Sequence, residues 1–258
     1  MKHLSRRQFF LGLSVALPLL AALDARYIEP KRVRLRRIPL PGVTGKRIRF
    51  VHITDIHHKG DRAYLESIVS SINSLSPDFV CLTGDLIEEA SMAPEALGIL
   101  AGIKSPVYGV PGNHDYWSKA VFEPFERTFA ATGGGWMQDG EAVTADRSFV
   151  LKGISSLSFR RGSLKPSASL PTIVLMHYPA WVKNLPAEKF ALILAGHSHG
   201  GQVRIPFYGP IFVPFGVDQY DLGMYQTASG PLYVNSGLGW FPVPIRFNCR
   251  PEITVFET

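Results

Sequence analysis

The sequence predicts an α/β protein (mixed α+β) whose strands form a mixed sheet or a two-sheet β-sandwich flanked by helices. In the first half of the chain, short apolar runs rich in β-branched residues alternate with segments of helical periodicity. The second half contains more strand-like runs than helical ones, which favours mixed sheets. With 258 residues, of which 46% are hydrophobic and 19% charged, the chain is long enough to bury one large core.

The first half contains four strand-like runs: a turn at Pro41-Gly42 separates the first two, and helices separate the others. The alternating "RVRLRRIPL" is followed by "KRIRFVHITD", "FVCLTGD" and "SPVYGVPGNHD". Between the second and third runs, residues 61–78 predict a helix, because apolar residues recur there at helical spacing: Leu65, Ile68, Val69, Ile72 and Leu75. A weaker helix is expected at 93–103, before the fourth run.

The second half continues with four more short apolar runs, each stopped by polar residues or glycine. They are "SFVLKGIS", "TIVLMHYP", "FALILAGHSHGG" and "PLYVNSGLG". The sequence shows no internal repeat, no low-complexity tract and no linker after residue 45. One domain is therefore expected.

The N-terminal segment is typical of a targeting sequence. A charged start and the pair Arg6-Arg7 precede an apolar run from Phe9 to Leu23, which is short for a membrane span of about 20 residues. "SRRQFFLG" resembles the twin-arginine export signal, which implies transport by the twin-arginine translocase to the periplasm or the outer face of the cytoplasmic membrane. Since "AALDA" is a weak cleavage site, an uncut anchor facing the cytoplasm is the alternative. We assign residues 1–25 to a signal or anchor and residues 26–258 to one folded domain.

Charge and cysteine usage narrow the function classes. The net charge is +6, but 12 of the 27 basic residues lie within the first fifth of the chain and the remainder is close to neutral. The folded part therefore lacks the basic stripe that a nucleic-acid enzyme would need. Cys81 lies in an apolar run, where we expect a buried thiol, and with Cys249 it forms neither a disulfide framework nor a zinc motif.

Five strand-like runs end in side chains that can bind a metal: Asp55 and His57, Asp85, Asn113, His177, and His197 and His199. The first three of these groups follow one another at about the length of one strand-helix unit, so parallel strands would bring them to one edge of the sheet. Carboxylate, imidazole and amide oxygen suit first-row divalent cations such as Mn, Fe, Zn or Ni. Seven ligands are too many for one ion and suit two ions that share a bridging carboxylate.

The order D-x-H, G-D, G-N-H-D, H and G-H-S-H across residues 50–200 resembles the calcineurin-like metallophosphoesterase superfamily. The resemblance implies a dinuclear phosphoesterase, with Mn as the first choice of metal, in which hydroxide formed at the ions attacks the phosphorus. It implies that one ion is held by Asp55, His57, Asp85 and His199, and the other by Asp85, Asn113, His177 and His197. It also implies that His114 contacts the phosphate and protonates the leaving oxygen, and that Asp115 orients His114.

Other polar residues carry less information. For His58, exposure to solvent is favoured slightly over a role around the site. His52 is expected to have a structural role. Asn235 and Ser236 follow a strand, where lining the site and forming a turn are equally good explanations.

The last quarter of the chain offers a hint about the substrate. Its aromatic residues form either a loop-rich sheet edge or an apolar rim near the metals that contacts a lipid or a nucleobase: Phe207, Tyr208, Phe212, Phe215, Trp240 and Phe241. This tail, with "GGQ", "GLG", "PIRF" and "RPEI", resembles membrane-associated, often twin-arginine-exported bacterial phosphodiesterases. The resemblance implies a phosphodiester or pyrophosphate substrate, small or lipid-linked, near a membrane.

Two alternatives to an exported phosphodiesterase stay open. The tail also resembles some UDP-2,3-diacylglucosamine pyrophosphatases of lipid A synthesis. Because the precursor of that pathway is made on the cytoplasmic side, this alternative requires an anchor facing the cytoplasm. A membrane-tethered metal-binding protein without turnover is the other alternative, and the complete set of ligands together with His114 weighs against it.

Overall fold

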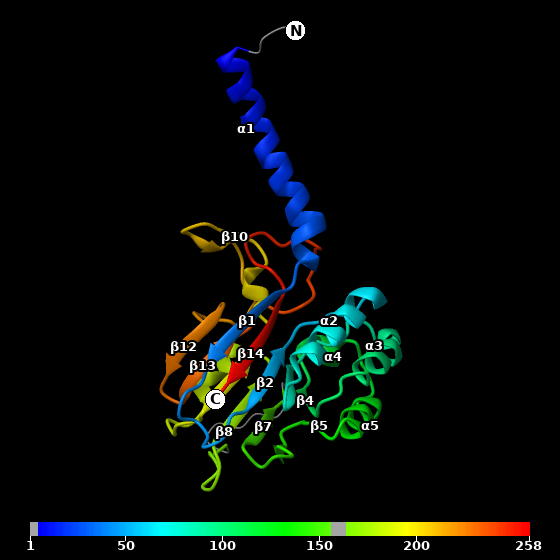
Figure 1. Cartoon of the computed structure of the whole chain (residues 1–258), viewed down its shortest axis with the longest axis vertical. Coiled ribbons are helices and arrows are strands. Elements are labelled where there is room, and N and C mark those ends of the chain that lie inside the picture. Colours follow the sequence, from blue (N-terminus) through cyan, green and yellow to red (C-terminus); the bar gives the residue numbers. More distant parts are fainter. Residues whose placement is uncertain (1–4, 156–163) are drawn as a thin grey trace.

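The computed structural model describes residues 5–155 and 164–258, and it contains two six-stranded sheets packed face to face (Figure 1). The first sheet has the order β1 (Arg34–Pro39), β14 (Glu252–Glu257), β2 (Arg49–Ile53), β3 (Phe79–Thr83), β4 (Val107–Val110) and β5 (Gly135–Trp136). The second has the order β12 (Gly223–Thr227), β13 (Gly230–Val234), β9 (Leu192–Ala195), β8 (Thr172–Met176), β7 (Val150–Ile154) and β6 (Glu141–Val143). The predicted two-sheet sandwich is confirmed.

Both sheets are mixed. Parallel pairs run from β2 through β3 and β4 to β5 and from β7 through β8 and β9 to β13, while β14 and β2, β6 and β7, and β12 and β13 are antiparallel. A short two-stranded ribbon, β10 (Arg204–Ile205) with β11 (Gly209–Pro210), stands apart from the sheets. The carboxyl ends of β2, β3 and β4 therefore lie at one edge of the first sheet, as those of β8 and β9 do in the second.

Alternation along the strands builds the core on both faces of the first sheet. Phe50 of β2 and Phe79 of β3 face the second sheet, and their rings stack at a centroid distance of 4.8 Å. Val51 and Val80, one residue further along, face the helices instead. These helices are α2 (Arg62–Leu75), α3 (Ala93–Leu100) and α5 (Glu123–Ala131). The helices predicted at 61–78 and 93–103 are thus found as α2 and α3.

The N-terminal helix α1 (Arg6–Leu23) projects away from the sandwich (Figure 1). Ser5 caps it through a capping box with Gln8. A π-helical turn at Asp24–Ile28 and a 3₁₀ turn at Glu29–Lys31 continue it to the domain. Residues 6–31 form a helical stretch that contains an 18-residue window of mean hydropathy 1.7. The stretch is long and apolar enough to cross a membrane, a property that signal sequences share.

The root of α1 is fixed to the domain by buried polar contacts. The carbonyl oxygen of Ala25 accepts a hydrogen bond from the backbone N–H of Arg246 at 2.9 Å. The buried carboxylate of Glu29 accepts hydrogen bonds from the backbone N–H groups of Asn248 and Cys249. These contacts fix the end of the helical stretch, at Ala25 and Glu29, to the domain.

Candidate active site

The seven predicted metal ligands all lie buried at the carboxyl ends of β2, β3, β4, β8 and β9. Five of them have a left-handed backbone, with φ between 44° and 66°: Asp55, His57, Asp85, His197 and His199. Residues other than glycine adopt this conformation rarely and at a cost in free energy, and such positions cluster at functional sites. The strand ends are thus bent to bring these side chains together.

A first group of donor atoms lies between β2 and the loop after β9. The Nε2 atoms of His57 and His199 are 3.1 Å apart, and His199 Nε2 is 3.4 Å from Asp55 Oδ1. Asp85 Oδ2 lies 3.5 Å from His57 Nε2. The four residues that the family resemblance assigns to one ion are therefore neighbours.

A second group lies beside the first. His177 Nε2 is 3.0 Å from Asn113 Oδ1, 3.2 Å from His197 Nδ1 and 3.2 Å from Asp85 Oδ2. The same Asp85 oxygen thus contacts a histidine of each group. This is the position that a bridging carboxylate would occupy.

The donor set fits divalent cations. In three of the histidines, the ring nitrogen that faces away from the donor group lies within hydrogen-bond distance of an oxygen. These contacts are His57 Nδ1 to Glu88 at 2.8 Å, His177 Nδ1 to the Thr83 carbonyl at 2.7 Å and His197 Nε2 to the Phe215 carbonyl at 2.7 Å. Because an N–H must point at each of these oxygens, the nitrogen that faces the group carries a lone pair in the neutral imidazole. Donor atoms about 3 Å apart match neighbouring ligands of an ion with bonds of about 2.0–2.1 Å.

The buried negative charge of two aspartates also indicates bound cations. Asp55 and Asp85 are almost fully buried, and within the described ranges their ion pairs are all with histidine, none with lysine or arginine. Two buried carboxylates so close together need positive charge to offset the cost of their burial. Bound cations would supply that charge.

Burial and neighbouring charges give two histidines of the second group opposite pKa shifts. Burial lowers the pKa of His177, but Asp85 and Asp55 outweigh it and raise the pKa to about 9. Burial, followed by repulsion from His177, lowers the pKa of His197 to about 3. His197 is therefore a neutral imidazole across the physiological range, which is the form that binds metal.

His114 lies next to both groups. Its backbone N–H donates to Asp85 Oδ1 at 2.8 Å, and its ring contacts that of His57 at a centroid distance of 4.7 Å. The ring nitrogen Nδ1 lies 3.1 Å from Oε1 of Glu88, whose other oxygen holds His57. Burial lowers the pKa of His114, but Glu88 and Asp85 outweigh it, so the net shift of the pKa is upward. A protonated imidazole is thus favoured beside the donor groups.

Asp115 has different partners from the one that the family resemblance implies. Its carboxylate accepts hydrogen bonds from the backbone N–H groups of Asp85, Leu86 and Gly112, each at 2.9 Å. It therefore fixes the loop that carries Asp85, whereas Glu88 is the carboxylate placed on the His114 ring. The sequence analysis did not single out Glu88, although its position three residues after Asp85 in "GDLIE" is a usable signal.

Replacing Glu88 with glutamine should weaken metal binding by about 10- to 100-fold, the usual effect of losing an acceptor behind a ligating histidine. The amide keeps the size of the side chain but removes the charge shared by His57 and His114. Metal titration by calorimetry measures the effect. The matched control is Glu89→Gln at the exposed neighbouring position. Equal affinities of the two variants would contradict the role of Glu88.

Close backbone approach requires glycine beside the ligands. A Cβ on Gly196 would overlap Thr54 Oγ1 and Asp55 Oδ2, so alanine there must displace a predicted ligand. Gly196→Ala should lower the free energy of unfolding by about 1–3 kcal/mol. Gly98→Ala is the control, because Gly98 lies exposed in α3 with open space around it and alanine there should stabilise the helix by about 0.5–1 kcal/mol. Denaturant unfolding of both variants tests the opposite signs.

A cavity of about 560 Å³ opens over the donor groups. Its polar wall includes Asp85, His114 and His199. Its apolar wall consists of residues of two loops: Ile211, Phe212, Pro214, Phe215, Phe241, Pro242 and Val243. Three of the aromatic residues proposed as a rim, Phe212, Phe215 and Phe241, thus line the site, whereas Phe207 and Tyr208 lie exposed on the same loop.

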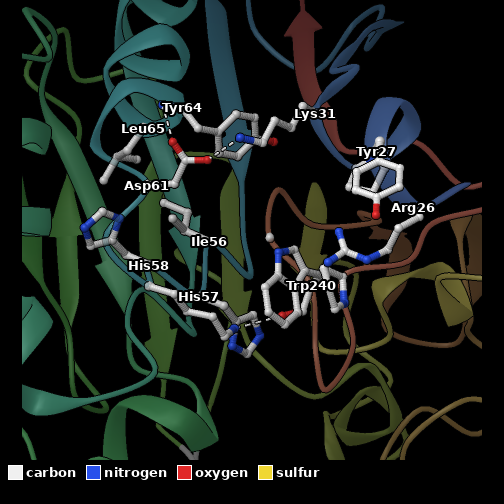
Figure 2. Close-up of a pocket in the computed structure, with 14 residues that line it drawn as sticks. Arg26, Tyr27, Lys31, Ile56, His57, His58, Asp61, Tyr64, Leu65 and Trp240 are labelled. Carbon is white, nitrogen blue, oxygen red and sulfur yellow. Dashed lines mark hydrogen bonds and ion pairs between the residues drawn. The ribbon is translucent and has the colours of Figure 1, made fainter. Parts of the chain in front are cut away.

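A second cavity, of about 500 Å³, lies between the root of α1 and the loop after β2 (Figure 2). Arg26, Lys31 and Lys59 line it, and the Lys59 ammonium group lies 4.2 Å from the centre of the Trp240 ring. His57 contributes to its wall, so this basic and aromatic cavity adjoins the first donor group. Trp240, expected at the rim of the site, lines this second cavity.

The remaining polar residues have structural roles. The expected exposure of His58 is wrong: its side chain is buried and Nε2 lies 2.7 Å from Glu95. His52 is buried with Nε2 at 2.8 Å from Thr83 Oγ1, as expected for a structural histidine. Asn235 accepts a hydrogen bond from the backbone N–H of Gly237, which is turn chemistry.

Comparison with known proteins agrees with this geometry. Residues 48–201 match the family model of the calcineurin-like phosphoesterases. Metallophosphoesterase YkuE of Bacillus subtilis is 32% identical, with 99% of this chain and 98% of the relative covered. Phosphodiesterase YaeI of Escherichia coli is 29% identical over 81% of both chains. UDP-2,3-diacylglucosamine pyrophosphatase LpxG of Chlamydia trachomatis is 24% identical over 94% of both chains. The chain therefore belongs to the calcineurin-like phosphoesterases and is a metal-dependent phosphoester hydrolase.

Proposed function

We propose that the protein uses two divalent cations to hydrolyse a phosphodiester or pyrophosphate bond in a membrane-proximal substrate. One ion would be held by Asp55, His57, Asp85 and His199, and the other by Asp85, Asn113, His177 and His197. The observation that carries the proposal is the contact of one Asp85 oxygen with a histidine of each donor group. A single shared carboxylate between two ligand sets is the arrangement of a two-metal site.

The protein's own residues supply orientation and a proton. When bound, the cations supply Lewis acidity, which lowers the pKa of water and offsets the charge on the phosphate oxygens. Asp115 fixes the Asp85 loop, and Glu88 fixes the rings of His57 and His114. His114 lines the cavity and is the group that donates a proton to the leaving oxygen.

Mn²⁺ is the proposed metal, with Fe, Zn or Ni as alternatives, because the donors are imidazole and oxygen without thiolate. The sulfur of Cys249 faces the carbonyl oxygen of His199, and Cys81 lies in the core between the sheets. Metal analysis of the purified protein, followed by reconstitution with each ion in turn, ranks these metals by turnover.

The substrate proposal is supported by the relatives and by the apolar wall of the cavity. A phosphodiesterase and a pyrophosphatase are among the similar proteins. The apolar side chains opposite the donor groups suit a substrate with a lipid portion. The pyrophosphate bond of UDP-2,3-diacylglucosamine is the second candidate, favoured by the similarity to LpxG along nearly the whole chain.

We further propose that residues 1–25 are a twin-arginine signal or a retained anchor, and that 26–258 form the catalytic domain. An exported protein would act at the outer face of the cytoplasmic membrane, whereas the lipid A alternative requires the cytoplasmic face. Replacing Arg6 and Arg7 by lysine, followed by fractionation of cells, separates these locations. Export that is lost in the variant supports the twin-arginine route.

The decisive experiment incubates the full-length protein in detergent with Mn²⁺ and three substrates. These are a chromogenic phosphodiester, a chromogenic monoester and UDP-2,3-diacylglucosamine. Turnover of the diester or the UDP-lipid that is lost in Asp85→Ala supports the proposal and ranks its two candidates. Stoichiometric metal binding without turnover of any of the three would favour the tethered metal-binding protein instead.

A further inference from the structure

The loop at residues 205–215, which includes β11, exposes an unusual amount of apolar surface to water. Phe207 and Phe215 are almost completely exposed, at 110% and 95% of their reference area. Four more large apolar residues of the loop are exposed: Ile205, Tyr208, Ile211 and Phe212. Apolar side chains gathered in this way mark a surface that contacts another apolar body.

This loop and the root of α1 are attached to the same short segment of the chain. The backbone N–H of Arg204 donates to the carbonyl of Phe247 at 2.9 Å, and Val203 forms a β-bridge with the same residue. On either side of Phe247, Arg246 bonds to the carbonyl of Ala25 and Asn248 bonds to Glu29. The loop is therefore held next to the point at which α1 leaves the domain.

Figure 1 shows the same relation, since the β10 ribbon stands at the end of the sandwich from which α1 projects. The turn after α1 exposes Tyr27 and Ile28, and the Arg26 guanidinium lies 4.9 Å from the centre of the Tyr27 ring. Arginine and tyrosine directly after an apolar helix are typical of the headgroup layer of a membrane. If α1 lies in a bilayer, the exposed loop stands at the depth of that layer.

We propose that the 205–215 loop is a second membrane-docking element, which inserts its aromatic side chains into the surface of the bilayer that holds α1. A lipid bilayer is the occupant that the structure favours, because the loop is tied to the root of a helix long enough to cross one. Phe207 and Tyr208 line neither of the cavities described above, so docking would bury side chains that have no role in the site.

Docking has a consequence for the substrate, and this step rests on the proposed function. Phe212 and Phe215 belong both to the exposed loop and to the apolar wall of the 560 Å³ cavity. With the loop in the bilayer, the apolar wall becomes continuous with the lipid. A lipid-linked phosphoester could then keep its acyl chains in the membrane while its phosphate reaches the donor groups.

Insertion is tested by fluorescence quenching with the full-length protein in vesicles of phosphatidylcholine and phosphatidylglycerol that contain nitroxide-labelled lipid. A thiol-reactive dye is placed at Phe207→Cys, since Cys81 and Cys249 are buried. Leu17→Cys on α1 reports insertion of the helix, and Arg127→Cys reports α5, which Figure 1 shows at the side of the domain away from α1 and the β10 ribbon. We expect quenching at positions 17 and 207 and none at 127. If the fluorescence of the label at 207 is quenched no more than that of the label at 127, the proposal is overturned.

The effect on turnover is tested with the double variant Phe207→Ser/Tyr208→Ser in the same vesicles. We expect turnover of vesicle-embedded UDP-2,3-diacylglucosamine to fall about tenfold, because the variant loses apolar surface that leaves water on docking. Turnover of a water-soluble chromogenic diester should not change. Equal rates of wild type and variant on the embedded lipid would overturn the inference that a lipid-linked substrate reaches the donor groups along the docked loop. If the wild type hydrolyses neither substrate, the proposed function fails while the quenching result still decides the docking.

Discussion

Asp85→Ala should abolish turnover, with a loss of at least about 10³-fold, and should release metal from both donor groups. Removing one stabilising group at a transition state costs about 10²–10³ in rate, and Asp85 faces the histidines of both groups. Its other oxygen accepts the backbone N–H of His114, so the variant also frees that loop. Asp85 is the residue that the proposal shares between both sets of ligands.

The loss is measured as metal content and as turnover of the preferred diester. Asp218→Ala is the matched control, because Asp218 is a partly exposed aspartate whose ion pair with Lys183 lies at the surface. A variant at Asp85 that keeps two equivalents of metal would contradict the assignment of Asp85 as a shared ligand.

His114→Ala should reduce turnover by about 10²–10⁴-fold and leave the metal content unchanged, the usual effect of losing a positioned general acid. Its ring nitrogen Nδ1 lies on Glu88, which holds the ring beside the two ligand groups. The proposal assigns this ring the role of proton donor. Metal content by atomic absorption and steady-state kinetics separate the two properties.

The leaving group provides a sharper test of His114. A substrate with an acidic leaving group such as p-nitrophenol needs little protonation, whereas an alkyl ester needs it fully. The loss in His114→Ala should therefore be much smaller for the nitrophenyl ester. An equal loss on both esters, or a parallel loss of metal, would assign His114 a role in binding and remove it as the acid.

The strand-end pattern predicted which side chains lie together, because the local sequence marks both the end of a buried strand and the polar group that follows it. A short apolar run followed by Asp, Asn or His predicts both a buried strand and the position of a polar group at its end, as for Asp85 after β3. Parallel pairing of β2, β3 and β4 then brings these ends together. The aromatic residues of the last quarter left a sheet edge and an apolar rim equally open, and only the structure shows that Phe212 lines the cavity and Phe207 does not.

Contacts between distant parts of the chain were beyond the sequence analysis. His58 is buried because Glu95 at the start of α3 reaches it across 37 residues of chain. Glu88 has a role only because two loops bring His57 and His114 to its two oxygens. The strand β14 was not expected either, since its place between β1 and β2 depends on pairings across about 200 residues. Helix α5 was not predicted either, because it is short and Phe125 and Phe129 give it only one apolar pair at helical spacing.

The strand β14 lies between β1 and β2, although the ribosome translates it after every other strand. The growing chain therefore exposes α1 long before the first sheet can close. During that interval the facing edges of β1 and β2 have no partner strand between them. A transport or insertion machinery that recognises α1 early meets an unfinished domain, whereas a machinery that requires a folded cargo must wait until residues 252–257 have left the ribosome.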